Sequence, residues 1–357
     1  MHFGISLSGR GPLASPDILG RVAQRADALR FSSIFVTDHV VIPLATDSVY
    51  PYSATGRVAA DWAQGYLEPL TVMSWLAGIT RHARLGTSVL VIPYRNPVLT
   101  AKMLATLDVV SGGRVILGAG VGWLREEFEA LHAAPYAERG RVTDEYLRLM
   151  RECWTREPVS FAGRYYDLPS VSALPKPLQP GGIPIWIGGH TDVAIRRAGE
   201  LGDGWHPIGL RPPADLRPDE YRAKADRVLE WARRAGRDPG AIALTFRAPL
   251  EIAPRRAKSP GGDRIPLRGT ADQVADDIRS YQAAGVTHFV FDLAATDLRG
   301  CLTILDRFAE DVRPGLRGER GGGRPRAPRA RAGGAGRRRP GSPGPRTGRH
   351  GARPAAR

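Results

Sequence analysis

Residues 85–118 read LGTSVLVIPYRNPVLTAKMLATLDVVSGGRVILG and hold the pattern that decides the fold. Leu85–Ile92 is rich in β-branched and apolar residues and predicts a buried strand, as does Val115–Gly118. The segment between them, Pro97–Ser111, predicts a helix. A strand, a helix and a second strand in this order imply parallel pairing through a right-handed crossover.

The same alternation continues on both sides of this unit. Further strands are expected at His2–Leu7, Ser33–Thr37, Ile185–Gly188, Gly204–Ile208, Ala243–Ala248 and His288–Asp292. Further helices are expected at Pro16–Arg30, Glu68–His82, Leu124–His132, Arg141–Trp154, Asp192–Leu201, Asp219–Ala235, Ala271–Ala284 and Leu298–Val312, and a small hairpin at Val159–Leu168. Eight strand-and-helix repeats predict a closed α/β fold, the (β/α)8 or TIM barrel. An open doubly wound sheet is the alternative, but the segment after Leu7 lacks the G-x-G-x-x-G spacing typical of it.

The charge of the chain is concentrated at its C-terminal end. The 357 residues carry a formal net charge of +15, of which residues 315–357 contribute +12 through 13 Arg and one Glu. This segment is almost entirely Gly, Ala, Pro and Arg, so we expect a disordered tail at 315–357 after a single domain at 1–314. Such a tail would bind nucleic-acid phosphates without specificity, and it has no aromatic residue on which a base could stack.

Several classes of protein are excluded by the rest of the sequence. No apolar run approaches the ~20 residues that span a bilayer. The first residues, MHFGISLSGRG, do not resemble a secretory signal. Cys153 and Cys301 lie far apart without metal-like spacing, and we expect two buried thiols in a reducing compartment. We therefore expect a cytoplasmic protein without a metal site and without a membrane partner.

Candidate site residues follow the predicted strands, because barrel active sites lie where strands end. Strand two ends in Thr37-Asp38-His39, in which His39 is suited to proton transfer and Asp38 would either orient the imidazole or support the loop. The alternative is a histidine that only satisfies loop backbone. Strand five ends in Gly188-Gly189-His190-Thr191 before a helix, which is the usual phosphate-receiving geometry.

Strand four leads into a second glycine-rich segment, Leu117–Trp123, which reads LGAGVGW. Glycines at alternate positions allow a ligand to approach the backbone closely. Close packing of a strand on a helix explains such a segment equally well, and the residues alone leave both readings open.

Four motifs occur in order along the chain: Thr37-Asp38-His39; Thr87-Ser88-Val89; Leu117–Trp123 with Glu127-Phe128; and Pro184–Gly189 (PIWIGG) with Gly202-Asp203-Gly204-Trp205. With these motifs the chain resembles the bacterial luciferase-like superfamily, most of all its oxidoreductases that use the deazaflavin coenzyme F420. The resemblance covers roughly residues 1–314. It implies a (β/α)8 barrel whose insertions at the C-terminal face help to cover the cofactor.

The resemblance also implies roles for single residues. Ser88-Val89 would form a non-prolyl cis peptide, a bulge behind the cofactor ring. Gly120-Val121-Gly122 and Gly188-Gly189-His190-Thr191 would hold the ribityl chain and its phosphate. His39 would lie near the reacting edge of the ring.

The function implied is hydride transfer between F420 and a small organic substrate, in a protein that is often a homodimer in this superfamily. An FMN-dependent monooxygenase is the alternative, and a non-catalytic cofactor- or nucleic-acid-binding protein is a third reading. Trp123 and Pro43 depart from the sugar-phosphate dehydrogenases of the superfamily and count against glucose 6-phosphate as the substrate.

Two further groups of residues are candidates for supporting roles. Tyr50, Tyr52 and Trp62 lie in the long loop after strand two, which would form either a lid or a subunit contact; Trp62 or Trp75 would lie at a dimer interface. The carboxylates of the F420 tail would favour a basic rim, for which the candidates are Arg10, Arg57, Arg95 and Lys176.

Overall fold

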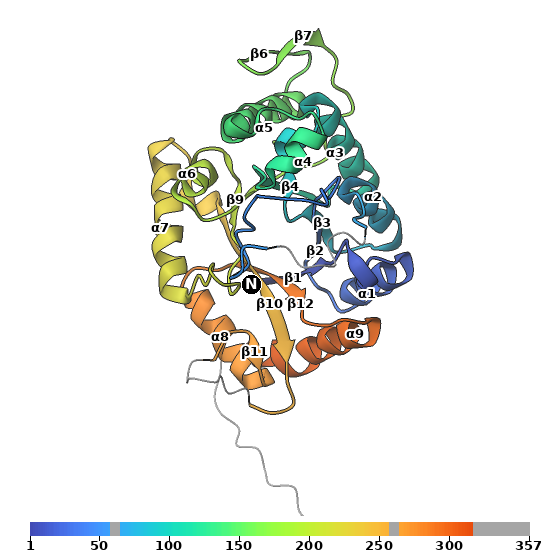
Figure 1. Ribbon diagram of the computed structural model, residues 1–357, viewed down its shortest axis with the longest axis vertical. Coiled ribbons are helices and arrows are strands. Elements are labelled where there is room, and N and C mark those ends of the chain that lie inside the picture. The colour runs from blue at the N-terminus through green and yellow to red at the C-terminus, as the bar shows by residue number, and fades with distance from the viewer. Residues whose placement is uncertain (58–64, 257–263, 317–357) are drawn as a thin grey trace, which may run out of the picture. The chain divides into compact units, whose positions relative to one another are not determined.

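The computed structural model of the protein describes residues 1–57, 65–256 and 264–316. Its strands are β1 (His2–Leu7), β2 (Ser33–Val36), β3 (Arg84–Thr87), β4 (Leu90–Val91), β5 (Val115–Gly120), β6 (Val159–Ala162), β7 (Asp167–Val171), β8 (Ile185–Gly188), β9 (Gly204–His206), β10 (Ala243–Ile252), β11 (Arg268–Gly269) and β12 (His288–Leu293). Its α-helices are α1 (Pro16–Ala28), α2 (Pro69–Ile79), α3 (Pro97–Ser111), α4 (Arg125–Ala130), α5 (Arg139–Thr155), α6 (Asp192–Leu201), α7 (Pro218–Arg234), α8 (Ala271–Ala283), α9 (Leu298–Arg307) and α10 (Arg313–Leu316). Figure 1 shows these helices arranged around the central strands.

The strands close into a ring. Within the described residues the eight barrel positions are occupied in the order β1, β2, β3, β5, β8, β9, β10, β12, and β12 returns to β1. All of these neighbours pair in parallel, for example Gly4↔Ser33 between β1 and β2 and Gly4↔Val290 between β1 and β12. The predicted (β/α)8 barrel is confirmed, and the open sheet is not formed.

The predicted third strand, Leu85–Ile92, is interrupted in the structure. β3 ends at Thr87, the Ser88–Val89 peptide is cis, and β4 resumes the pairing with β5 at Leu90↔Ala119. Ile92 and Pro93 then belong to a 3-10 turn that runs to Tyr94. The cis bond implied by the resemblance is therefore present at the expected peptide.

Glycines of the two following strands enclose the side chain of Val89. A Cβ on Gly120 would fall 2.4 Å from Val89 Cγ2, and one on Gly188 would fall 2.8 Å from Val89 Cγ1. A Cβ on Gly118 would overlap the backbone oxygen of Thr87 at 1.8 Å. Packing against the Ser88–Val89 bulge, and not packing of a strand on a helix, accounts for the missing side chains at these positions.

Local signals in the sequence act as expected. Ser15 caps α1 by accepting from Ile18 N at 3.3 Å, with Pro16 at the first helical position. The predicted hairpin is confirmed as the antiparallel pair β6–β7, which lies beside α5 and outside the ring of helices (Figure 1). Cys153 and Cys301 are buried free thiols, also as expected.

The C-terminal end of the described fold is α10. Leu316 packs against the core, and Arg279 Nη2 donates to the backbone oxygen of Gly315 at 2.9 Å. Residues 317–357, which include nearly all of the predicted tail, lie outside the described residues. None of the helices in the described ranges is long and apolar enough to cross a membrane.

Candidate active site

A cavity of 1640 Å³ opens where the barrel strands end. It exceeds the ~300–1,000 Å³ of an ordinary ligand pocket and so has room for a cofactor together with a substrate. The cavity is lined by all of the site residues predicted from the sequence: Asp38, His39, Ser88, Val89, Gly120, Val121, Gly122, Gly188, Gly189, His190 and Thr191. Residues as far apart in the chain as Asp38 and Thr191 are therefore brought to one mouth.

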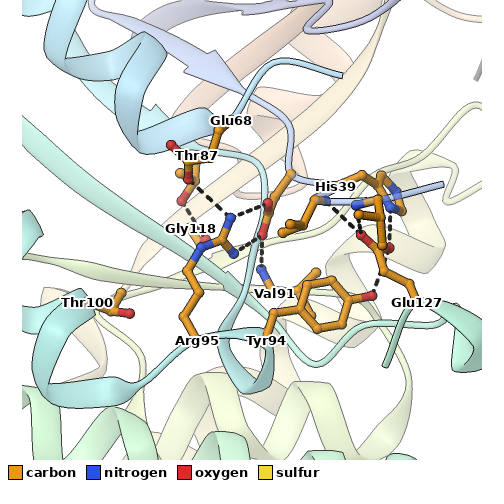
Figure 2. Close-up of polar contacts among 12 residues, drawn as sticks. His39, Glu68, Thr87, Val91, Tyr94, Arg95, Thr100, Gly118 and Glu127 are labelled. Atoms are coloured by element: carbon orange, nitrogen blue, oxygen red, sulfur yellow. Dashed lines mark hydrogen bonds and ion pairs between the residues drawn. The ribbon is translucent and has the colours of Figure 1, made fainter. Parts of the chain in front are cut away.

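His39 is paired with a carboxylate that lies on α4. Its Nδ1 is 2.6 Å from Oε2 of Glu127, which is fully buried, and the two positions are separated by 88 residues in sequence. A carboxylate can only accept, so the hydrogen of the neutral imidazole lies on Nδ1 and the lone pair on Nε2. Figure 2 shows Glu127 between His39 and Tyr94, whose hydroxyl donates to Oε2 at 3.0 Å. The ring is thereby held in the tautomer that can receive a proton at Nε2.

The same helix start fixes the loop that follows His39. Oε1 of Glu127 accepts from Val40 N at 2.7 Å and from Val41 N at 3.2 Å. Oε1 of Glu126 accepts from Asp47 N at 2.7 Å and from Ser48 N at 3.0 Å. Two adjacent glutamates thus anchor two parts of one loop over the cavity.

Asp38 contacts a different part of the site. Its oxygens accept from Arg95 Nη1 and Nη2 at 2.7 and 2.8 Å and from Val91 N at 2.8 Å. Burial alone would lower the pKa of Arg95, but the ion pairs with Asp38 and Glu68 raise it above its usual value. The side chain that binds the imidazole of His39 is therefore Glu127, whereas Asp38 binds Arg95 and the backbone of Val91, after the bulge.

The hydroxyl of Ser88 is held by a buried hydrogen-bond chain. Thr245 Oγ1 donates to Trp205 O at 2.9 Å, so it accepts from His206 Nδ1 at 2.6 Å. Nε2 of His206 then accepts from Ser88 Oγ at 2.7 Å. Burial and the charge of Arg247 lower the pKa of His206 to about 3, so this ring is neutral. Each partner has a defined role as donor or acceptor, which fixes the serine of the cis peptide.

The predicted phosphate site has the expected local geometry. Gly189 has φ +91°, a value that favours glycine, and Thr191 caps α6 by accepting from Ala194 N. His190 lies beside Lys224, whose Nζ is 3.3 Å from both Nδ1 and the backbone oxygen of His190. Burial and this ammonium lower the pKa of His190, which keeps the ring neutral. The residues at the start of α6 line the cavity, and the N-terminus of a helix carries a partial positive charge.

Arginines surround this end of the cavity: Arg139, Arg141, Arg196, Arg197 and Arg227 all line it. Arg197 is buried and paired with Asp144, and Arg227 Nη1 is 2.9 Å from Asp192 Oδ1. Of the residues predicted for a basic rim, only Arg10 lines the cavity. Arg95 pairs with Asp38, and Lys176 pairs with Glu157 at 3.0 Å.

The long loop after β2 contributes aromatic side chains. Tyr50 packs against Trp123 with ring centroids 5.1 Å apart and against Tyr52 at 5.8 Å, and the Tyr66 ring lies 5.1 Å from that of His39. Tyr50, Tyr52, Tyr66 and Trp123 all line the cavity, as expected of a lid or substrate wall. Trp62 lies outside the described residues.

The remaining side of the mouth carries charged residues that the sequence reasoning missed. Asp292 on β12 accepts from Arg247 Nη2 at 2.8 Å and from Arg211 Nη2 at 2.8 Å. Burial alone would raise the pKa of Asp292, but the two guanidinium groups hold it well below its usual value. Two of these three charged residues could have been predicted from the sequence, because Arg247 and Asp292 lie at the ends of predicted strands. No group of three or more His, Cys, Asp or Glu among the described residues is placed to hold a metal ion.

Comparison with known proteins agrees with this geometry. A family model described as luciferase-like monooxygenase matches residues 1–259. The chain is 35% identical over 216 residues to an uncharacterised protein of Mycobacterium tuberculosis, covering 60% of this chain and 72% of that protein. It is 30% identical over 336 residues to an F420-dependent glucose-6-phosphate dehydrogenase of Intrasporangium calvum, covering 82% of this chain and 93% of that enzyme.

Solved structures share the fold. An F420-dependent secondary alcohol dehydrogenase in complex with an F420–acetone adduct superposes with a TM-score of 0.71 at 21% identity, covering 89% of this chain and 99% of that one. At this identity the likeness concerns the barrel and its order of elements. Together with the match over residues 1–259, it leads to one conclusion: the chain belongs to the luciferase-like monooxygenase family.

Proposed function

We propose that the protein is an oxidoreductase that transfers a hydride between coenzyme F420 and a small organic substrate. The observation that carries the proposal is the meeting, in one cavity, of the His39–Glu127 pair with the Gly188–Thr191 turn at the start of α6. The F420-dependent glucose-6-phosphate dehydrogenase that aligns over 93% of its length supports the choice of cofactor.

The residues of the cavity fit this cofactor. The Gly188–Thr191 turn offers backbone N–H groups to the phosphate, and the Ser88–Val89 bulge forms the wall behind the ring. The tail of F420 carries several carboxylates, and the arginines at the same end of the cavity suit them. Arg139, Arg141, Arg196 and Arg227 are the side chains that we propose to hold it.

When bound, F420 supplies a ring carbon that accepts or returns a hydride. We assign the accompanying proton to His39. As the substrate C–H bond gives up its hydrogen with both electrons, the substrate hydroxyl loses its proton to Nε2 of His39 and becomes a carbonyl. The carboxylate of Glu127 stabilises the imidazolium that forms, because its Oε2 already accepts the hydrogen of Nδ1 with 2.6 Å between the two heavy atoms. In the opposite direction His39 returns the proton.

Cofactor binding tests the proposal first. Titration of purified protein with F420 should quench the cofactor fluorescence, and a parallel titration with FMN should bind more weakly. FMN binding without F420 affinity would replace the proposal by an FMN-dependent monooxygenase. The variant His39→Ala should keep the affinity for F420 within about twofold and lose about 10²–10⁴ in turnover under anaerobic conditions. Unchanged turnover in that variant would remove His39 from the mechanism.

We also propose that the protein forms a homodimer through α2 and α3. These helices lie side by side (Figure 1) and expose apolar side chains: Trp75 at 39%, Leu99 at 59%, Met103 at 40% and Val110 at 65%. A second copy of the same face would cover them. Light scattering on a size-exclusion column tests this, with Val110→Glu expected to yield a monomer.

A further inference from the structure

Three charged side chains meet at the ends of β9, β10 and β12. Arg247 on β10 and Arg211 in the loop after β9 both bind the carboxylate of Asp292 on β12. Arg247 also donates from Nη1 to the backbone oxygen of Ser88 at 2.5 Å and to its Oγ at 3.1 Å. Two guanidinium groups thus share one carboxylate, which leaves an excess positive charge on this side of the cavity.

Arg211 keeps unused donor capacity. Its Nε is buried and has no hydrogen-bond partner among the described residues, although its side chain is 35% exposed and lines the cavity. A buried N–H donor without a partner is uncommon and costly in a folded protein. The loop that presents it is closed by Leu210 N to Asp215 O at 2.9 Å and by Arg211 N to Ala214 O at 3.0 Å. The backbone that carries Arg211 is therefore fixed, and its side chain lies at the wall of the cavity.

The carboxylate that holds both arginines lies further round the ring than the phosphate turn. Arg211 follows β9, the neighbour of β8, but Asp292 lies on β12, which is separated from β8 by β9 and β10 and from β2 by β1 alone. Burial raises the pKa of Tyr50, and the charges of Arg211 and Arg247 partly offset this rise, so its hydroxyl lies within their field. Arg10 lines the same cavity and adds to the positive potential.

We propose that Arg211, together with Arg247, binds an anionic group of the substrate, so that the substrate is a small alcohol or carbonyl compound bearing a carboxylate or a phosphate. This inference rests on the proposed function. The substrate would extend from the arginines to His39 within the same cavity, which Tyr66 also lines with its ring 5.1 Å from that of His39. Neutral alcohols would lack the charge that this positive side of the cavity would bind.

Anion binding to the F420-loaded protein tests the inference without turnover. Because bound F420 occupies the cofactor phosphate site, added anions cannot bind there. Inorganic phosphate and acetate are titrated separately by calorimetry at constant ionic strength. We expect the wild type to bind at least one of these anions. The anion that binds more tightly indicates whether the substrate carries a phosphate or a carboxylate. Arg211→Gln should weaken that binding at least tenfold, Arg211→Lys should restore part of it, and the exposed control Arg21→Gln should leave it unchanged.

The outcomes separate the two proposals. No anion binding in the wild type, or equal binding in Arg211→Gln, overturns the inference and leaves the proposed function standing. A tenfold loss of F420 affinity in Arg211→Gln without loss of anion binding also overturns it, because Arg211 would then serve the cofactor. If neither F420 nor FMN binds, the proposed function fails; the same titrations on the unloaded protein then decide the inference by whether Arg211→Gln still loses affinity.

Discussion

Replacing Glu127 by glutamine changes the charge beside His39 while keeping the shape of the side chain. Oε1 would still accept from Val40 N and Val41 N, because these N–H groups need an acceptor. The amide nitrogen would then face His39 and Tyr94, where Oε2 stood. An amide nitrogen donates, so Nδ1 of His39 would have to accept, and the ring hydrogen would move to Nε2. The variant therefore inverts the tautomer and blocks proton uptake at the nitrogen that we assign to catalysis.

The magnitude follows from the two roles of the carboxylate. Loss of general acid–base catalysis lowers turnover by about 10²–10⁴, equivalent to roughly 2.7–5.5 kcal/mol of transition-state stabilisation. Loss of a buried charged acceptor should lower the free energy of unfolding by about 1–3 kcal/mol. Cofactor affinity should stay within about twofold of wild type, because the proposed phosphate and tail contacts lie on α5, α6 and α7 and not on α4.

Three measurements check this prediction. Anaerobic turnover gives the rate, fluorescence quenching gives the F420 affinity, and nitrogen NMR of the His39 ring reports which nitrogen carries the hydrogen. Glu129→Gln serves as the control, since Glu129 is an exposed residue of the same helix. A Glu127→Gln protein that binds F420, keeps the hydrogen on Nδ1 and turns over within threefold of wild type would refute the assignment of His39 and Glu127.

Three further predictions concern stability, the cofactor tail and the chain end. Burial lowers the pKa of His206 to about 3, so below pH 6.5 the unfolded chain binds a proton at this residue and the folded chain does not. Between pH 6.5 and pH 3 the free energy of unfolding should therefore fall by ~1.4 kcal/mol for each unit by which the pH is lowered. In urea titrations His206→Gln should reduce this pH dependence by the same amount. Arg227→Gln should weaken F420 binding about two- to fivefold, less so at high salt, and leave FMN binding unchanged, because FMN has no acidic tail; equal losses for both would contradict this role. Truncation after Gly318 keeps Leu316 in its place on the core, and the melting temperature and F420 affinity should match those of the full chain.

The fold was predictable because its signals are local and repeated. Apolar runs and helix caps such as Ser15-Pro16 indicate each strand-and-helix unit in the sequence. Because the strands must then pair in parallel, few topologies of the sheet are possible. The same rule gathered His39, Ser88 and Gly188 at one mouth, since the ends of parallel strands meet there. The break in the third strand was expected from the resemblance and had no signal in β-propensity, as Ser88-Val89 lies within an apolar run.

The partners of these residues were harder to predict, because hydrogen bonds across the barrel leave no periodic pattern. Glu127 lies 88 positions from His39 on a short helix, whereas Asp38, the neighbour in sequence, binds Arg95. Both residues follow β2, which ends at Val36, and there the side chain of Asp38 contacts Arg95 and Val91 N instead of the ring. Arg211 could not be predicted as a site residue for a different reason. It belongs to an irregular loop whose conformation is fixed by its own backbone contacts.

Arg247 connects the two halves of the mouth and explains why Arg211 is the better probe of the substrate. Its guanidinium donates both to Ser88, at the bulge behind the proposed ring site, and to Asp292, at the proposed anion site. Removing it would release Asp292 and the Ser88–His206 chain together, so a loss of activity would not distinguish cofactor from substrate. Arg211 binds Asp292 alone among these groups and leaves the Arg247–Asp292 pair intact when it is replaced. A change confined to anion affinity in Arg211→Gln therefore follows only if Arg211 binds the substrate and not the cofactor.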